Sequence, residues 1–155
     1  MTILNNILIM LAILGTALIA GTFFIFSFAV MSALKALPPN EGAAAMRSIN
    51  VVIQNPVFLG VFMGTALVSL VLAVLSVLNW TEPGSYFILA GAALYVVGSF
   101  LLTIVFNVPL NNGLESGTVE WADYHGPWTL WNHIRTVASL ASTGAFAFAA
   151  AHRFF

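Results

Sequence analysis

The sequence predicts an all-α integral membrane protein, an antiparallel bundle of four helices with a short interfacial helix between the first two. Hydrophobic residues make up 61% of the 155 residues and charged residues only 6%, whereas a soluble domain carries about 25% charged residues. The chain also has long runs without a formal charge, at 1–34, 48–81, 83–114 and 136–152. A helix needs about 20 apolar residues to cross the hydrocarbon core, so each run, with its flanks, is long enough for one crossing.

Prolines and capping residues set the expected bounds of these helices. Paired prolines at 38–39 end the first helix, and Asn55-Pro56 has the residue types of a helix N-cap and first position. Pro109 and Pro127 limit the polar segment between the last two helices. The expected transmembrane helices are about 7–34, 56–78, 86–107 and 128–151, with an interfacial helix at about 41–54. They leave no room for a soluble domain, so we expect 1–155 to form a single transmembrane domain.

Charge and cysteine content exclude several classes of protein. Only four Lys and Arg residues are present against five Asp and Glu, which excludes a nucleic-acid partner. The absence of cysteine from the sequence excludes disulfides, thiolate metal sites and thiol catalysis. Four crossings place both termini on one side of the membrane and both long connections, 35–55 and 107–127, on the other. Three of the four basic side chains lie at the connection side, so the positive-inside rule places the connections in the cytoplasm.

Polar side chains continue from these connections into the third and fourth helices. The stripe of the fourth helix consists of Trp128, Asn132, Arg135, Ser139 and Ser142, and that of the third consists of Tyr95, Ser99, Thr103 and Asn107. Their spacing of three and four residues puts each stripe on one helix face, and a polar face is costly against lipid. The stripes therefore predict an interior polar cavity that opens at the connection face. For the Ser and Thr positions, hydrogen bonds that merely join helices explain the pattern equally well. An arginine at this depth needs a partner or a task, so we predict that Arg135 lies close to Asn107.

Other features are open to two interpretations. Gly60 and Gly64 form a GxxxG pattern, which predicts close helix packing within the bundle or between copies in a homo-oligomer. Trp121, Tyr124, Trp128 and Trp131 are typical of an aromatic belt at the headgroup level, and the alternative is a wall on which a flat aromatic substrate stacks. His125 and His133 lack the spacing of a metal-binding motif, so we expect no metal site.

Several stretches of the chain resemble the anthrone oxygenase-like family of small four-helix membrane proteins. The stretches are FAVMSAL at 28–34, MRSIN at 46–50, NPVF at 55–58, NVPLNN at 107–112 and WTLWNHIR at 128–135. The resemblance implies a bacterial inner-membrane protein and the oxidation of an anthrone to an anthraquinone with molecular oxygen. The family motif residues fall on Asn50, Asn107, Asn111, Asn132 and Arg135.

We therefore expect a membrane monooxygenase that acts on a flat phenolic or anthrone-like molecule at the polar intramembrane site. An anthrone reacts with oxygen once it is deprotonated to its enolate, so this chemistry needs no metal; whether any cofactor beyond molecular oxygen takes part stays open. The catalytic candidates are Arg135, Asn132 and Asn107, with His133 or Asp123 as the base. The substrate-binding candidates are Asn50, Asn111, Asn112, Trp128, Trp131 and Tyr95. Two alternatives stay open: a membrane redox protein that binds haem or a quinone, and a non-catalytic subunit that binds or transports a ligand.

Overall fold

The computed structural model describes residues 3–154, and this part of the chain is helical, without a β-strand. Four of its helices are long and apolar enough to cross a membrane: Ile3–Lys35, Pro56–Leu78, Ser85–Ser116 and Trp121–His152. The all-α class and the four long apolar helices that the sequence predicts are therefore confirmed.

Two of the four long helices contain π-helical segments. The first consists of α1 (Ile3–Ile25), η1 (Phe26–Val30) and α2 (Met31–Lys35). The third consists of α5 (Ser85–Tyr95), η2 (Val96–Leu101), η3 (Thr103–Asn107) and α6 (Val108–Ser116). The other long helices are α4 (Pro56–Leu78) and α7 (Trp121–Phe154), and a short helix, α3 (Pro39–Val52), joins α2 to α4. Wider π-helical turns are frequent at functional sites, because they redirect the side chains that follow them.

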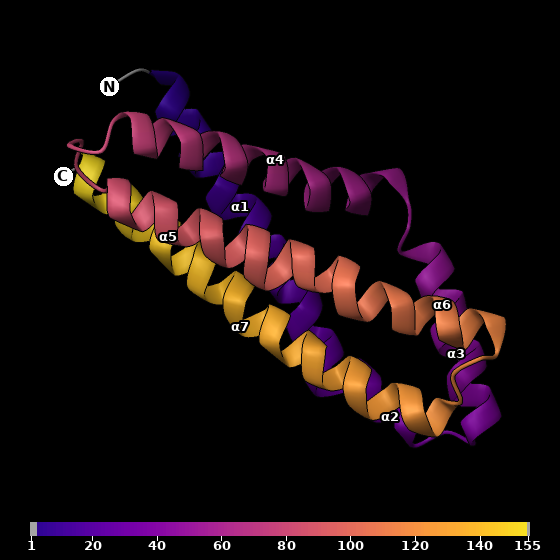
Figure 1. Cartoon of the computed structure of the whole chain (residues 1–155). Helices are drawn as coiled ribbons and strands as arrows, with labels where there is room; N and C mark the ends of the chain where they lie inside the picture. The colour runs from indigo at the N-terminus through magenta and orange to yellow at the C-terminus, as the bar shows by residue number, and fades with distance from the viewer. Residues whose placement is uncertain (1–2, 155) are drawn as a thin grey trace.

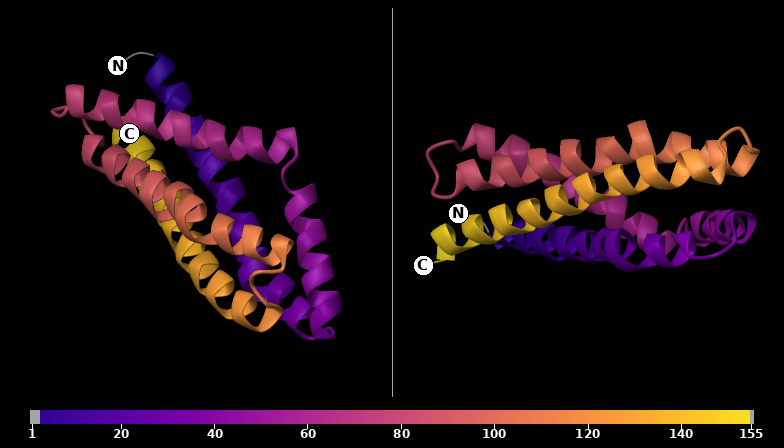
Figure 2. Two further views of the ribbon diagram at one scale, coloured as in Figure 1. Left: turned by 45° about the vertical axis from the view of Figure 1, so that its right-hand side comes forward. Right: turned by 90° about the horizontal axis from the view of Figure 1, so that it is seen from below.

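The four long helices run antiparallel to their chain neighbours, and both ends of the chain lie at the same end of the bundle (Figure 1). Helices α2, α3 and α6 lie together at the opposite end. Both views in Figure 2 keep α7 beside α5, while the left view shows α4 diverging from the third helix toward α3. The short turn at 79–85 joins α4 to α5, and Gly84 opens α5 with a positive φ of 77° that glycine adopts without strain.

Two helix bounds differ from the sequence-based expectation. The third helix does not end near Asn107 but continues to Ser116, and Gly117, with a φ of 73°, forms its C-cap. Pro109 is tolerated because it follows directly on the π-helical segment η3, where the regular hydrogen-bond ladder is already interrupted. The fourth helix begins at Trp121, so Pro127 lies inside it. Membrane helices tolerate an internal proline when neighbouring groups satisfy the freed backbone.

Apolar packing and hydroxyl hydrogen bonds hold the terminal half of the bundle together. Phe146 is fully buried against residues of α1, α4 and α5, and a Cβ on Gly91 would lie 3.1 Å from its ring, so a larger residue at 91 would require the ring to shift. Ser139 donates to Ser99 Oγ over 3.0 Å, and Ser142 donates to the Gly91 carbonyl over 2.7 Å. These serines face the interior as the stripes predict, and their role in joining helices is confirmed.

The aromatic residues at the connection end lie inside the protein. Trp121, Tyr124 and Trp128 are buried and pack in succession along α7, against Met46 of α3 and other apolar side chains. The interpretation of these three as an outward-facing belt is therefore wrong, because α3 folds over them. Trp131 is half-buried and stacks on Phe106 with 3.6 Å between ring centroids.

The GxxxG pattern on α4 makes no close helix contact within the bundle. A Cβ added to Gly60 or Gly64 would meet no other atom of the described chain within 4 Å. Close packing of this pattern against another helix of the bundle, one of the two interpretations of GxxxG, is therefore excluded for the described residues.

Candidate functional site

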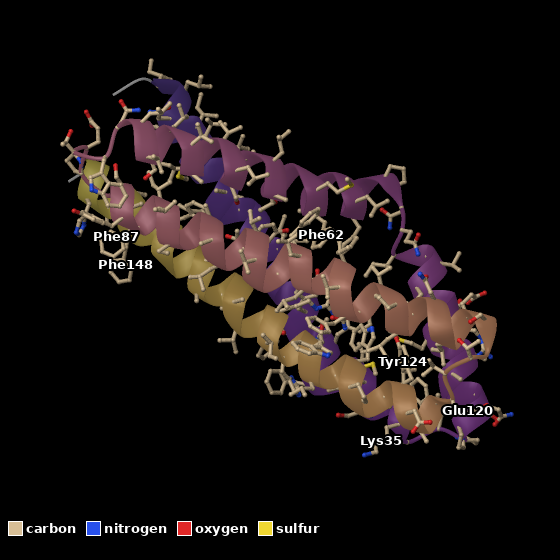
Figure 3. All side chains as sticks on the ribbon, in the orientation of Figure 1. Lys35, Phe62, Phe87, Glu120, Tyr124 and Phe148 are labelled. Atoms are coloured by element: carbon tan, nitrogen blue, oxygen red, sulfur yellow. The ribbon has the colours of Figure 1, made fainter. Side chains whose placement is uncertain are left out.

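A cavity of about 300 Å³ lies at the connection end of the bundle, between all four long helices and α3. Its lining residues come from α1 and η1 (Thr22, Phe23, Phe26), α3 and its end (Met46, Ile49, Asn50, Ile53, Gln54), α4 (Phe58, Leu59, Phe62), η3 and α6 (Thr103, Ile104, Asn107, Val108, Asn111, Asn112) and α7 (Trp128, Arg135). Figure 3 shows Phe62 between α4 and α5, and Tyr124 between α7 and α6. The size and the mixture of aromatic walls with a few polar groups are typical of a small-molecule site.

Among the described residues that line the cavity, Arg135 alone is charged, and its side chain is 3% exposed. One terminal nitrogen donates to Thr103 Oγ1 over 2.9 Å and the other donates to Asn132 Oδ1 over 2.7 Å. The guanidinium carbon lies 4.1 Å from the centroid of the Phe23 ring and 5.4 Å from that of Trp128. All of these partners are neutral, so no described residue in contact with the guanidinium supplies a countercharge.

Asn132 does not line the cavity itself, but it accepts a hydrogen bond from the Arg135 guanidinium. Its amide nitrogen donates to the Phe23 carbonyl and to Ser27 Oγ, over 2.8 Å in each case, and Ser27 in turn lies 3.1 Å from Thr136 Oγ1. Because both donor hydrogens are used on α1 and η1, the amide oxygen is turned toward Arg135. The charged group is thus fixed by side chains of three different helices before any ligand binds.

Three buried polar atoms of lining residues have no hydrogen-bond partner among the described residues. They are Asn50 Nδ2, Asn107 Oδ1 and Arg135 Nε. Native proteins leave few buried polar atoms unpaired, and each such atom needs an explanation. One acceptor and two donors on lining residues of three different helices therefore have unused hydrogen-bonding capacity.

Asn107 and Arg135 both line the cavity, as the two stripes predict, but no hydrogen bond joins them among the described residues. Asn107 instead donates through Nδ2 to the Trp128 carbonyl over 3.2 Å. Asn111 Oδ1 accepts two hydrogen bonds of 2.8 Å, from Tyr124 Oη and from Trp128 Nε1. Asn111 therefore fixes the orientation of the Trp128 ring, which is an aromatic wall of the cavity.

The structure brings together some of the candidate residues and separates others. Asn50, Asn107, Asn111, Asn112, Trp128 and Arg135 line the cavity, and Asn132 contacts Arg135. His133 lies beside the Phe28 ring, 5.6 Å between centroids, and Asp123 is exposed. Neither of these proposed bases lines the cavity. Trp131 and Tyr95 also lie outside the lining, and Tyr95 Oη donates to the Phe62 carbonyl over 3.1 Å.

Three further residues contribute to the site although they were not among the candidate catalytic or binding residues. Thr103 belongs to the predicted polar stripe of the third helix, four residues before Asn107. This spacing indicated that it faces the interior, where it accepts a hydrogen bond from Arg135. Phe23 and Phe62 had no such signal, because an apolar helix gives no periodicity that separates cavity-facing from lipid-facing phenylalanines.

The fold and the site define a small membrane protein with an interior cavity that has aromatic walls and a few polar groups. The anthrone oxygenase family model matches residues 58–145. The chain belongs to this family, and the matched region contains Asn107, Asn132 and Arg135. No curated protein and no solved structure matches the chain. Within the described residues, no cluster of three or more His, Asp or Glu side chains could hold a metal ion.

Proposed function

We propose that this chain is a membrane oxygenase that oxidises a flat phenolic or anthrone-like molecule with molecular oxygen inside the cavity. The observation that supports this proposal most strongly is the buried Arg135 guanidinium, which has only neutral partners and lines an aromatic cavity. A buried charge without a countercharge is costly, so a ligand that brings negative charge gains most of the available electrostatic stabilisation.

The guanidinium is suited to stabilise an enolate. Loss of one proton from the central CH₂ of an anthrone converts its carbonyl oxygen into an oxyanion, and donors fixed in advance stabilise such a charge as it develops. Arg135 is fixed in this way by Thr103 and Asn132. The enolate reduces oxygen, and a carbon–oxygen bond forms at the same carbon. One oxygen atom becomes the second carbonyl of the anthraquinone, and the other leaves as water with the two hydrogens of the CH₂ group.

The other lining residues orient the substrate. Phe23, Phe62 and Trp128 present aromatic surfaces against which a flat polycycle packs. Asn107 Oδ1 accepts a hydrogen bond from a phenolic hydroxyl, and Asn50 Nδ2 donates one to a carbonyl. By stabilising the oxyanion, Arg135 makes the bound substrate more acidic, and the proton passes to solvent water at the polar end of the cavity, where Asn112 is exposed.

The test is oxygen uptake by the purified chain in lipid nanodiscs with anthrone as substrate. We expect one oxygen molecule consumed for each anthraquinone formed, at a rate well above that of empty nanodiscs, which corrects for spontaneous oxidation. Anthrone that binds without oxygen uptake above this background would contradict the oxygenase and favour a ligand-binding or transport subunit. A Soret band in the absorbance spectrum of the purified chain, from a haem that is required for oxygen uptake, would favour the haem alternative.

A further inference from the structure

The cavity reaches the outer surface of the bundle along one line of the third helix. Ile104, Val108 and Asn112 recur every four residues, so they lie on one face of η3 and α6. All three line the cavity and are exposed, Ile104 to 48% and Val108 to 39%. A residue that both lines a cavity and is exposed on the outer surface marks the rim of its opening.

The opposite side of this opening is formed by the first turns of α4. From its second turn on, α4 packs against the third helix, where Tyr95 Oη donates to the Phe62 carbonyl and the ring centroids of Phe62 and Phe100 lie 5.2 Å apart. The contacts between α4 and the third helix lie mainly along α5 and η2. The two helices diverge from there in both Figure 1 and Figure 2. Leu59, in the first turns of α4, therefore lines the cavity across from the third helix.

The rim changes in polarity along its length. Ile104 and Val108 are apolar and lie toward the middle of the membrane-crossing helix Ser85–Ser116. Gln54 and Asn112, at the connection end, are exposed amides. The opening therefore extends from the headgroup level into the hydrocarbon region. Its deeper part presents only apolar side chains to a molecule that arrives.

We propose that this opening is a lateral portal through which a neutral, planar, bilayer-dissolved ligand enters the cavity, with Ile104 and Val108 as the residues that select for apolar ligands. The proposal rests on the proposed function, because that function supplies the ligand. An apolar rim admits the neutral form of an anthrone, and an ion is disfavoured there by the cost of its desolvation. The ligand acquires its charge only after it reaches Arg135, which lies at the inner wall.

The natural absence of cysteine makes the portal directly testable. Ile104→Cys, folded in nanodiscs, is labelled with N-phenylmaleimide, and Val105→Cys is the matched control. Val105 is adjacent, 56% exposed and outside the cavity lining. Val108→Cys serves as a second rim variant if Ile104→Cys does not fold. Stopped-flow quenching of tryptophan fluorescence by 9,10-anthraquinone reports association and dissociation, because Trp128 lines the cavity.

A blocked portal slows entry and exit alike. We expect the adduct of Ile104→Cys to lower both rate constants about tenfold while Kd changes by less than about threefold. The Val105→Cys adduct should match the unlabelled protein. Equal rates for both adducts would overturn the portal and leave the proposed function standing. Weaker binding without slower dissociation would also overturn it, since the label would then fill the cavity itself. Anthraquinone that does not bind to the unlabelled protein would overturn the proposed function and the portal together.

Discussion

A countercharge placed beside Arg135 tests whether the cavity is built for an anion. In Asn132→Asp, a carboxylate oxygen replaces the amide oxygen that lies 2.7 Å from the guanidinium. The size of the side chain hardly changes, but the arginine gains an internal ion pair. A ligand anion then has to compete with this carboxylate for the same charge.

The expected loss of affinity follows from Coulomb's law. Two charges centred about 4 Å apart attract by roughly 4 kcal/mol at an effective dielectric constant near 20. If the ligand anion recovers part of this attraction by sharing the guanidinium, its affinity falls by about two to three powers of ten. Aspartate also loses the hydrogen bond donated to the Phe23 carbonyl, at a cost of about 1–3 kcal/mol, which the new ion pair offsets. The free energy of unfolding should therefore change little.

The measurement compares two ligands in nanodiscs by quenching of tryptophan fluorescence. An ionised hydroxyanthraquinone should lose affinity for Asn132→Asp, while its neutral O-methyl ether should bind as it does to the unchanged protein. Asn132→Ala is the matched control, because it removes the amide that accepts a hydrogen bond from Arg135 without adding a charge. It should weaken the binding of the two ligands to a similar extent. Equal affinity of the anion for Asn132→Asp and the unchanged protein would refute the assignment of Arg135 as an anion-binding group.

Three further predictions concern residues around the site. His133→Gln and Asp123→Asn should each retain anthrone-dependent oxygen uptake within about twofold, because neither side chain lines the cavity; a loss of about 10²–10⁴-fold would identify that residue as the general base. Thr103→Val keeps the shape but removes a hydrogen-bond acceptor of the guanidinium, so kcat should fall by about tenfold; an unchanged kcat would show that this bond does not position Arg135. Ser139→Ala breaks its hydrogen bond to Ser99, so thermal unfolding should show a loss of about 0.6 kcal/mol with unchanged oxygen uptake; lost uptake would place this serine in the catalytic machinery.

The interior stripes could be predicted from sequence because helical geometry alone determines them. Asn132 and Arg135 are three residues apart, so they share a helix face, and the arginine does bond the asparagine. The same geometry explains why His133, one of the two expected bases, does not line the cavity. It follows Asn132 directly, about 100° further around the helix, and it lies against Phe28 instead of the cavity.

Features that depend on tertiary packing could not be predicted in this way. Whether Trp121 and Tyr124 lie at the headgroup level or inside the protein depends on how α3 folds back, and nothing in the local sequence of α7 determines that. Pro109 and Pro127 indicated helix ends, but π-helical turns and neighbouring groups let both helices continue past them. The bounds of the third and fourth helices were therefore wrong at the connection end, where the cavity lies.

The central claim is that Arg135 serves the reaction and not the fold. Its two hydrogen bonds and its contacts with Phe23 and Trp128 contribute several kcal/mol, but the desolvation of the buried charge costs a similar amount. Replacement by an apolar side chain is therefore expected to change the free energy of unfolding by no more than about 2 kcal/mol. Arg135→Lys keeps the charge but loses the planar fork that reaches Thr103 and Asn132 together.

The most direct measurement is anthrone-dependent oxygen uptake by Arg135→Leu in nanodiscs, with thermal unfolding of the same preparation recorded alongside. We predict that uptake falls to the rate of empty nanodiscs while the unfolding transition stays cooperative and near that of the unchanged protein, and that Arg135→Lys restores little of the activity. Full activity in Arg135→Leu would contradict the account and place the chemistry elsewhere. An unfolded Arg135→Leu protein would contradict it too, since the arginine would then be needed for the fold.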